Sequence, residues 1–105
     1  MLQVIRTERY ASWARSVQDD RAAAKIAIRV DRLIHGNAGD VKAVGGGVSE
    51  MRIDHGPGYR VYFARRRNTL ILLLCGGTKK SQETDIEDAK RLLADWKTND
   101  QDGTV

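Results

Sequence analysis

Two arginines flank a predicted β-hairpin and could together bind a phosphate group. Residues 56–58 read Gly-Pro-Gly, which is typical of a turn. A symmetric hairpin centred on Gly56 pairs residues at equal distances from it, and this register places Arg52 opposite Arg60. Like charges directly opposite each other destabilise a sheet, so such a pair needs another reason to be there. Two planar guanidinium groups match the oxygens of a phosphate, which predicts a polyanion-binding site.

The same face carries two acids, which give the arginine pair a purely structural alternative. Glu50 and Asp54 alternate with Arg52 along the predicted strand 48–54, so all three side chains point the same way. If each carboxylate neutralises one arginine, no positive charge remains for a ligand. The phosphate hypothesis therefore requires that the two arginines share a face and are not each locked by an acidic partner of their own.

Other side chains near the hairpin could transfer protons or contact a bound polyanion. Tyr62 follows Arg60 on the same face, and its phenol can stack on a base or exchange a proton. Histidine titrates closest to neutrality, which makes His55 in the turn a candidate base, although most turn histidines are simply exposed. Lys79 and Lys80 come directly after an apolar strand, where side chains often meet a ligand. The further basic candidates for contact with a polyanion such as a nucleic acid are Lys42, Arg65, Arg66 and Arg67.

Positive charge is concentrated in the middle of the chain. The net charge is +4, but residues 42–80 hold eight basic against two acidic residues, giving +6. Residues 81–105 hold three basic against seven acidic residues, giving −4, and residues 1–41 supply the remaining +2. This distribution favours a polyanion-binding surface on the central strands, although a well-solvated surface has the same composition.

The sequence offers little to a metal, a nucleotide or a membrane. Its two histidines and one cysteine lie far apart, so no zinc-like spacing arises and no metal or other cofactor is expected. The glycines at 45–47 lack the residues of nucleotide-binding loops and indicate a bulge or a close backbone approach. No segment approaches the roughly 20 apolar residues that cross a bilayer, and the N-terminus is too short for a signal peptide. We expect a cytoplasmic protein with no membrane partner and a buried Cys75.

Helix signals and strand patterns define the elements that must position these residues. Thr7 is the expected N-cap of a first helix, and Asp19 or Asp20 begins a second. Thr84 and Glu87 have the spacing of a capping box for a third. The expected elements are strand 2–6, helix 8–17, helix 19–35, a loop at 39–47, strands 48–54, 59–64 and 70–75, and a last helix from about 84.

The order β-α-α-β-β-β-α predicts an α+β fold with a mainly antiparallel sheet and helices packed on one side. Residues 70–75 are continuously apolar, as in a central strand buried on both faces. Trp13 and Trp96 are expected to fill the core. With 41% hydrophobic residues, residues 1–97 are expected to fold as one domain. Residues 98–105 have almost nothing to bury and are expected to fray.

Three segments resemble a known family. Residues 36–42, 50–62 and 72–82 closely resemble the phage-type HigB proteins, also called addiction-module killer proteins. The most specific blocks are Gly-Pro-Gly-Tyr-Arg-Val-Tyr at 56–62 and Gly-Gly-Thr-Lys-Lys-Ser-Gln at 76–82. The resemblance spans nearly the whole chain, and the order of elements is similar to that of the RelE/ParE fold.

This resemblance implies the toxin of a type II toxin–antitoxin system, a ribosome-dependent endoribonuclease that cuts mRNA in the ribosomal A site. In such enzymes the 2′-hydroxyl attacks the adjacent phosphate, and no metal is required. The implied partners are the ribosome, mRNA and a HigA-like helix-turn-helix antitoxin, with operator DNA reached only through the antitoxin. On the motif match, Arg60 resembles the arginine that stabilises the phosphate, Arg52 its strand neighbour, and Lys79 the basic residue after the last strand.

The chain departs from the family pattern at positions that concern proton transfer. Some RelE proteins carry lysines where this chain has Val48 and Glu50, and a tyrosine where it has Asp85. Tyr62, His55 and Asp85 therefore all remain open as the general base. Two other functions also remain open: a ParE-like inhibitor of DNA gyrase that cuts no RNA, and a nontoxic basic RNA-binding module that acts with an antitoxin.

Overall fold

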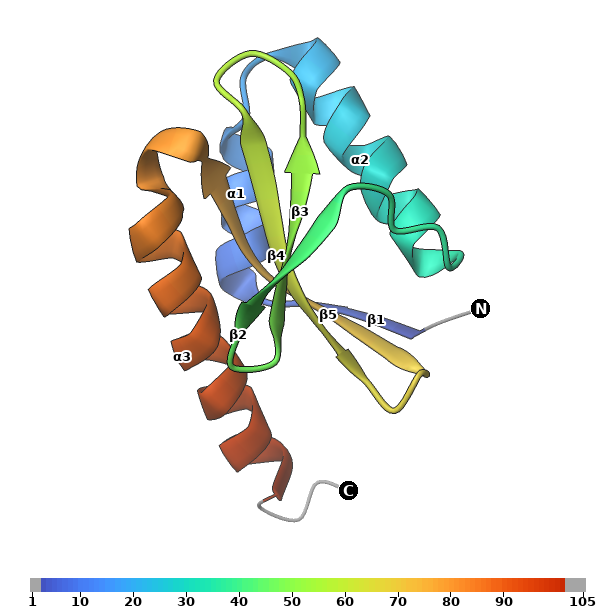
Figure 1. Ribbon diagram of the computed structural model, residues 1–105, viewed down its shortest axis with the longest axis vertical. Helices are drawn as coiled ribbons and strands as arrows, with labels where there is room; N and C mark the ends of the chain where they lie inside the picture. The colour runs from blue at the N-terminus through green and yellow to red at the C-terminus, as the bar shows by residue number, and fades with distance from the viewer. Residues whose placement is uncertain (1–2, 102–105) are drawn as a thin grey trace.

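The computed structural model describes residues 3–101, which form a five-stranded sheet with three α-helices (Figure 1). Thr7 is the N-cap of the first helix, as predicted, and Asp19, one of the two residues predicted to begin the second helix, is its N-cap. Both side chains accept hydrogen bonds from backbone N–H groups of the first turn. The elements are β1 Gln3–Arg6, α1 Glu8–Ser16, α2 Asp20–Ile34, β2 Val41–Gly45, β3 Val48–Ile53, β4 Tyr59–Arg66, β5 Leu70–Thr78, the 3₁₀ turn η1 Lys79–Ser81 and α3 Gln82–Gln101.

The sheet is mixed and has the strand order β1-β5-β4-β3-β2. β1 runs parallel to β5, whereas the other three neighbouring pairs are antiparallel. The β3–β4 hairpin has the predicted register, since Arg52 is the Cα partner of Arg60 and Met51 that of Val61. Met51 and Val61 are fully buried, and a slip of one residue would turn them to the opposite face.

The segment predicted as a loop, residues 39–47, contains a strand. β2 pairs antiparallel with β3, with a bulge after Ala43, so the order has one more strand than β-α-α-β-β-β-α. The glycines at 45–47 all have positive φ, and α3 packs closely over them. A Cβ at Gly46 would lie 3.1 Å from the side chain of Lys90. The predicted bulge and the predicted close approach therefore both occur.

Helices cover both faces of the sheet, which corrects the expectation that they pack on one side (Figure 1). On one face, α1 and α2 bury residues such as Tyr10 and Leu33 against β3, β4 and β5. On the other face, α3 buries Ala89 and Leu93 against β4 and β5. The cause lies in these two central strands, whose buried side chains alternate between the two clusters and leave apolar surface on both faces.

α3 begins earlier and ends later than the sequence pattern predicts. η1 leads directly into α3 at Gln82, so Thr84 lies within the first helical turn and is not the N-cap. α3 runs on to Gln101 through the first part of the segment that was expected to fray, and residues 102–105 of that segment lie outside the described residues. No helix found within residues 3–101 is both long and apolar enough to span a bilayer.

Two glycines in β5 make room for side chains from both helical layers. A Cβ on Gly76 would overlap the ring of Trp13 from α1, and one on Gly77 would overlap the carboxylate of Asp85 from α3. Trp13 packs against the core as predicted, and Cys75 is fully buried as predicted. Both layers thus reach the strand backbone at the end of the sheet that holds the arginine pair.

Candidate functional site

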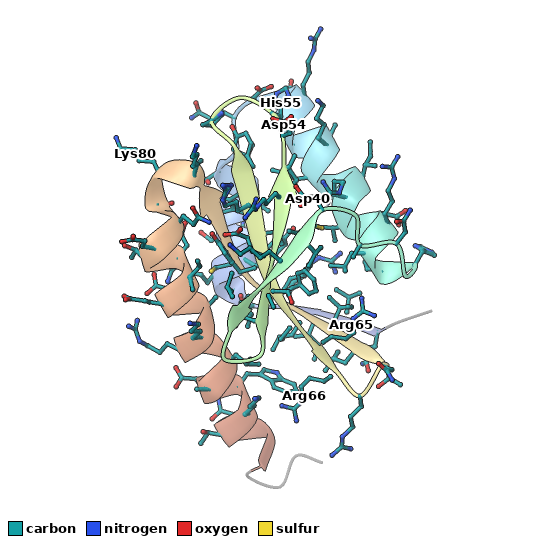
Figure 2. The ribbon with its side chains drawn as sticks, in the orientation of Figure 1. Asp40, Asp54, His55, Arg65, Arg66 and Lys80 are labelled. Carbon is teal, nitrogen blue, oxygen red and sulfur yellow. The ribbon has the colours of Figure 1, made fainter. Side chains whose placement is uncertain are left out.

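Arg52 and Arg60 lie side by side on one face of the sheet, as the hairpin register predicts. The next strand places Gly77 of β5 beside Arg60. On the other flank, the backbone N–H of Arg52 donates to the carbonyl oxygen of Asp40 at 3.0 Å, just before β2 (Figure 2). The neighbouring row of the same face consists of Lys42, Glu50, Tyr62 and Cys75.

One buried carboxylate connects the two arginines. The Glu50 side chain is fully buried, and its Oε1 accepts a hydrogen bond from Arg52 Nε at 3.0 Å. Its Oε2 lies 3.6 Å from Arg60 Nε. The same oxygen accepts hydrogen bonds from the Tyr62 hydroxyl at 3.1 Å and the Gln82 amide at 2.8 Å. We call these five residues the Glu50 cluster; it joins β3, β4 and α3.

Hydrogen bonds within the cluster keep Glu50 ionised. Burial by itself raises the pKa of Glu50. Hydrogen bonds from Gln82, Arg52 and Tyr62, together with the positive charge of Arg60, outweigh burial and hold this pKa below its ordinary value. Burial, together with the charge and hydrogen bond of Glu50, raises the pKa of Tyr62 far above its ordinary value. Tyr62 is therefore a neutral donor to Glu50, and its fully buried ring is not placed to stack on a base.

The two arginines share one acid and do not have one each. Both ion pairs go to Glu50 rather than to Asp54, so two guanidinium groups face a single negative charge. Arg60 Nε is buried and has no hydrogen-bond partner among the described residues. The Arg52 side chain is 38% exposed. The cluster thus carries excess positive charge and has one guanidinium open to solvent, an arrangement that can receive an anion.

Two lysines border the cluster. The backbone N–H of Lys79 donates to the carbonyl oxygen of Gly58 at 2.9 Å. A Cβ on Gly58 would lie 3.5 Å from Lys79 Cβ and 4.0 Å from Arg60 Nη1, so both side chains flank this glycine. On the edge strand β2, Lys42 is the Cα partner of Glu50. The basic residues that the structure brings to one end of the sheet are therefore Arg52, Arg60, Lys42 and Lys79.

The two other candidate bases lie on different sides of the sheet. His55 Nε2 is 3.1 Å from Oδ2 of Asp19, the N-cap of α2, so it points toward the layer opposite α3. Figure 2 shows His55 at the tip of the β3–β4 hairpin. Asp85 lies over Gly77 on the α3 side and accepts a hydrogen bond from Ser81 Oγ at 2.5 Å. Within the described residues, no three His, Cys, Asp or Glu side chains gather as a possible metal site.

The remaining basic candidates are spread over the molecule. Lys80 is exposed in η1, just before α3, whereas Arg66 lies at the far end of β4 (Figure 2). A run of extended strand about 20 Å long separates Arg66 from Arg60. The Arg66 guanidinium carbon lies 5.3 Å from the ring centroid of Trp96. The candidates at the opposite end of β4 from the Glu50 cluster, or in the turn that follows it, are Arg65, Arg66 and Arg67.

Two residues that support the cluster escaped the sequence analysis. Gln82 is the first residue of α3 and reaches Glu50 because α3 packs on this face. Arg29 of α2 comes from the opposite layer and donates to the carbonyl oxygens of Arg52 at 2.6 Å and Ala38 at 3.1 Å. No motif contains Arg29, and the block 76–82, which ends in Gln82, does not indicate a contact with Glu50. Both contacts depend on how segments distant in sequence pack together.

Fold and site together define an α+β protein with a mixed sheet and a basic cluster at one sheet end, which is compatible with a RelE-like fold. The chain belongs to the family described as phage derived protein Gp49-like (DUF891), which matches residues 16–97. This family is toxin-like, related to RelE and HigB, and associated with toxin–antitoxin toxins, which implies an antitoxin partner. An uncharacterized protein of Haemophilus influenzae is 46% identical over 91 residues, or 87% of this chain and 92% of the relative. No solved structure matches significantly.

Proposed function

We propose that this chain is the toxin of a type II toxin–antitoxin system and cuts mRNA on the ribosome. The observation that carries the proposal is the Glu50 cluster, in which Arg52 and Arg60 share one carboxylate and retain excess positive charge. Guanidinium groups bind phosphate oxygens bidentately, so the pair fits a scissile phosphodiester. Lys79 and Lys42 add charge where the RNA backbone would enter and leave.

In the proposed reaction, the 2′-hydroxyl oxygen of the RNA attacks the adjacent phosphorus, and the bond from phosphorus to the 5′-oxygen breaks. One proton leaves the 2′-hydroxyl and one proton joins the 5′-oxygen, so the products are a 2′,3′-cyclic phosphate and a 5′-hydroxyl. Negative charge develops on the phosphoryl oxygens in the transition state, where Arg52 and Arg60 stabilise it. Nucleophile and leaving group both belong to the RNA, so the step balances without a cofactor.

Asp85 is the candidate base that the geometry favours. It lies over Gly77, the cross-strand neighbour of Arg60, on the face that holds the cluster. A carboxylate can accept the proton of the 2′-hydroxyl. His55 instead contacts Asp19 on the other side of the sheet. The ribosome is expected to contribute the remaining alignment of the RNA.

The proposed partners follow from this activity. The toxin would act in the cytoplasm, where ribosomes carry mRNA. A HigA-like helix-turn-helix antitoxin would hold it inactive, and operator DNA would be reached only through that antitoxin. A small helix-turn-helix protein encoded in the neighbouring reading frame is the expected sign of this arrangement.

Primer extension on mRNA after induction of the chain tests the activity. Wild-type protein is expected to give codon-phased breaks and growth arrest. Arg60→Ala is expected to lose both, with cleavage slowed by at least about 100-fold, because a preorganised donor to the transition state is gone. Arg21→Ala removes the same charge from α2 and is expected to retain both. DNA damage without mRNA breaks would indicate a ParE-like gyrase inhibitor, and RNA binding without growth arrest a nontoxic module.

Loss of chemistry must be separated from loss of fold. Circular dichroism and co-purification with the antitoxin are expected to show that Arg60→Ala still folds and still binds its partner. Arg60→Lys keeps the positive charge but lacks the planar fork, so it is also expected to fail in cleavage. An Arg60→Ala chain that remains toxic at equal expression would refute the role given to Arg60.

A further inference from the structure

A second basic site lies at the opposite end of β4 from the Glu50 cluster. There, β1, the β4–β5 turn and the C-terminal part of α3 enclose an open hollow of about 420 Å³. Its polar lining comes from Gln3, Arg66, Arg67 and Thr69, and its aromatic surface from Trp96. No carboxylate is among the described residues that line it, so nothing in the hollow neutralises the two arginines.

The side chains of this hollow are arranged for stacking. The Arg66 guanidinium carbon lies over the Trp96 ring, 5.3 Å from its centroid, and Trp96 is only partly buried. Arg66 is itself half-buried, which restricts its orientation. Arg67 follows in a turn with φ +52° and is exposed, with no side-chain hydrogen bond or ion pair to the described part of the chain. The hollow therefore offers a preformed planar surface next to a free guanidinium.

We propose that this hollow binds one ribonucleotide of an RNA strand, with its base stacked on the Arg66–Trp96 pair and its phosphate at Arg67. Single-stranded RNA is held by stacking on aromatic and guanidinium planes together with charge contacts to its backbone, and the hollow supplies both. Gln3 and Thr69 place hydrogen-bonding groups at its rim. The inference rests on the proposed function, because it assigns a second contact to the same RNA-dependent toxin.

Tryptophan fluorescence gives a direct readout of this site. Trp13→Phe leaves Trp96 as the sole tryptophan, and stacking of a base is expected to quench it. Titration with a short oligouridylate should quench saturably, whereas inorganic phosphate and oligoglutamate should not. If Trp13→Phe fails to fold, the same quenching is obtained as the difference between wild type and Trp96→Phe. Quenching by oligoglutamate equal to that by oligouridylate would mean an acidic peptide site and overturn the proposal.

Charge variants separate this site from general attraction of RNA to a basic protein. Arg66→Ala is expected to weaken oligouridylate binding about fivefold or more, as loss of one stacking contact does. Arg67→Ala should lower the slope of log affinity against log salt by about 0.7, the amount for one phosphate contact on a single strand. Arg21→Ala on α2 removes the same charge elsewhere. Equal effects of Arg21→Ala and Arg66→Ala would overturn the proposal.

Two further arms separate this inference from the proposed cleavage and identify the source of the RNA. Arg60→Ala is expected to lose cleavage but keep Trp96 quenching, so each claim can fail without the other. Purified ribosomes without mRNA and ribosomes with bound mRNA are then compared for wild type and Arg66→Ala. A defect on both would identify ribosomal RNA, and a defect only with mRNA bound would identify the message. An unchanged affinity in both would refute the site.

Discussion

Arg52 lies directly opposite Arg60 across the β3–β4 ladder, and the two guanidinium groups share one buried carboxylate. Like charges in this position oppose strand pairing, so their free-energy cost must be offset by Glu50 and by the apolar face of the hairpin. The arrangement makes Glu50 the residue on which both the stability and the charge of the site depend.

Replacing the carboxylate of Glu50 by an amide tests this dependence. Glu50→Gln is expected to lower the free energy of unfolding at neutral pH by on the order of 3 kcal/mol, because the arginines lose their common partner. The folded-state pKa of Glu50 is depressed, so its stabilisation is present above the unfolded value of about 4.3 and is lost as pH falls through the folded pKa. Urea unfolding at a series of acidic pH values measures both effects. Glu87→Gln, at an exposed site of α3, is the control, and identical curves for the two variants would contradict the prediction.

Arg29 is expected to stabilise β3 from the opposite helical layer. Arg29→Met keeps an apolar stem but leaves the carbonyl oxygens of Arg52 and Ala38 without their charged donor. The expected loss is about 2 kcal/mol, the range of a hydrogen bond to a charged group. Urea unfolding checks the value, and hydrogen exchange should show faster opening of β3. Arg32→Met, on an exposed position of α2, should change little; equal losses in both variants would show that the two carbonyl contacts are unimportant.

Gly76 and Trp13 are expected to be energetically coupled. Gly76→Ala places a Cβ into the Trp13 ring, and such overpacking costs about 1–3 kcal/mol. Trp13→Leu removes the ring, so the added cost of Gly76→Ala should largely disappear in the double variant. A double-mutant cycle by urea unfolding should give a coupling free energy above about 0.5 kcal/mol. Additive single effects would show that the ring does not set the need for glycine.

His55 is expected to hold the hairpin tip and not to act in cleavage. Its imidazole contacts Asp19, and this hydrogen bond, together with backbone N–H groups of α2, holds the pKa of Asp19 below its ordinary value. His55→Ala should therefore lower the melting temperature but leave mRNA cleavage close to wild type. Asp19→Ala should lower the melting temperature more than Asp20→Ala, because only Asp19 caps α2. A His55→Ala protein that folds but does not cleave would restore His55 as a candidate base.

The arginine pair could be predicted because its cause is local. A Gly-Pro-Gly turn and period-2 alternation on both flanking strands fix one register, and that register alone places Arg52 beside Arg60. Glu50 was visible on the same face, but as one of two neutralising acids. That it serves both arginines depends on side-chain orientation and on Gln82 arriving from α3, which no sequence pattern specifies.

The parts of the fold that were predicted wrongly also depend on contacts between segments distant in sequence. β2 is a short edge strand that ends in glycine, so its sequence gives only a weak strand signal. Its extended conformation depends on pairing with β3, which a local pattern does not reveal. The apolar run 70–75 did indicate helices on both faces of the sheet, because a strand that is buried on both faces must be covered on both. The N-cap of α3 was misplaced because η1 already starts the turn before Thr84.

A single negative charge built into the Glu50 cluster has a consequence for turnover. A bound phosphodiester adds one more negative charge. The charges of Glu50, Arg52, Arg60 and the phosphodiester would then add up to zero. The cyclic phosphate product carries that same single charge. These three residues would then attract the product no more strongly than the substrate, so the cut strand could depart without a change in the charge of Glu50, Arg52 or Arg60.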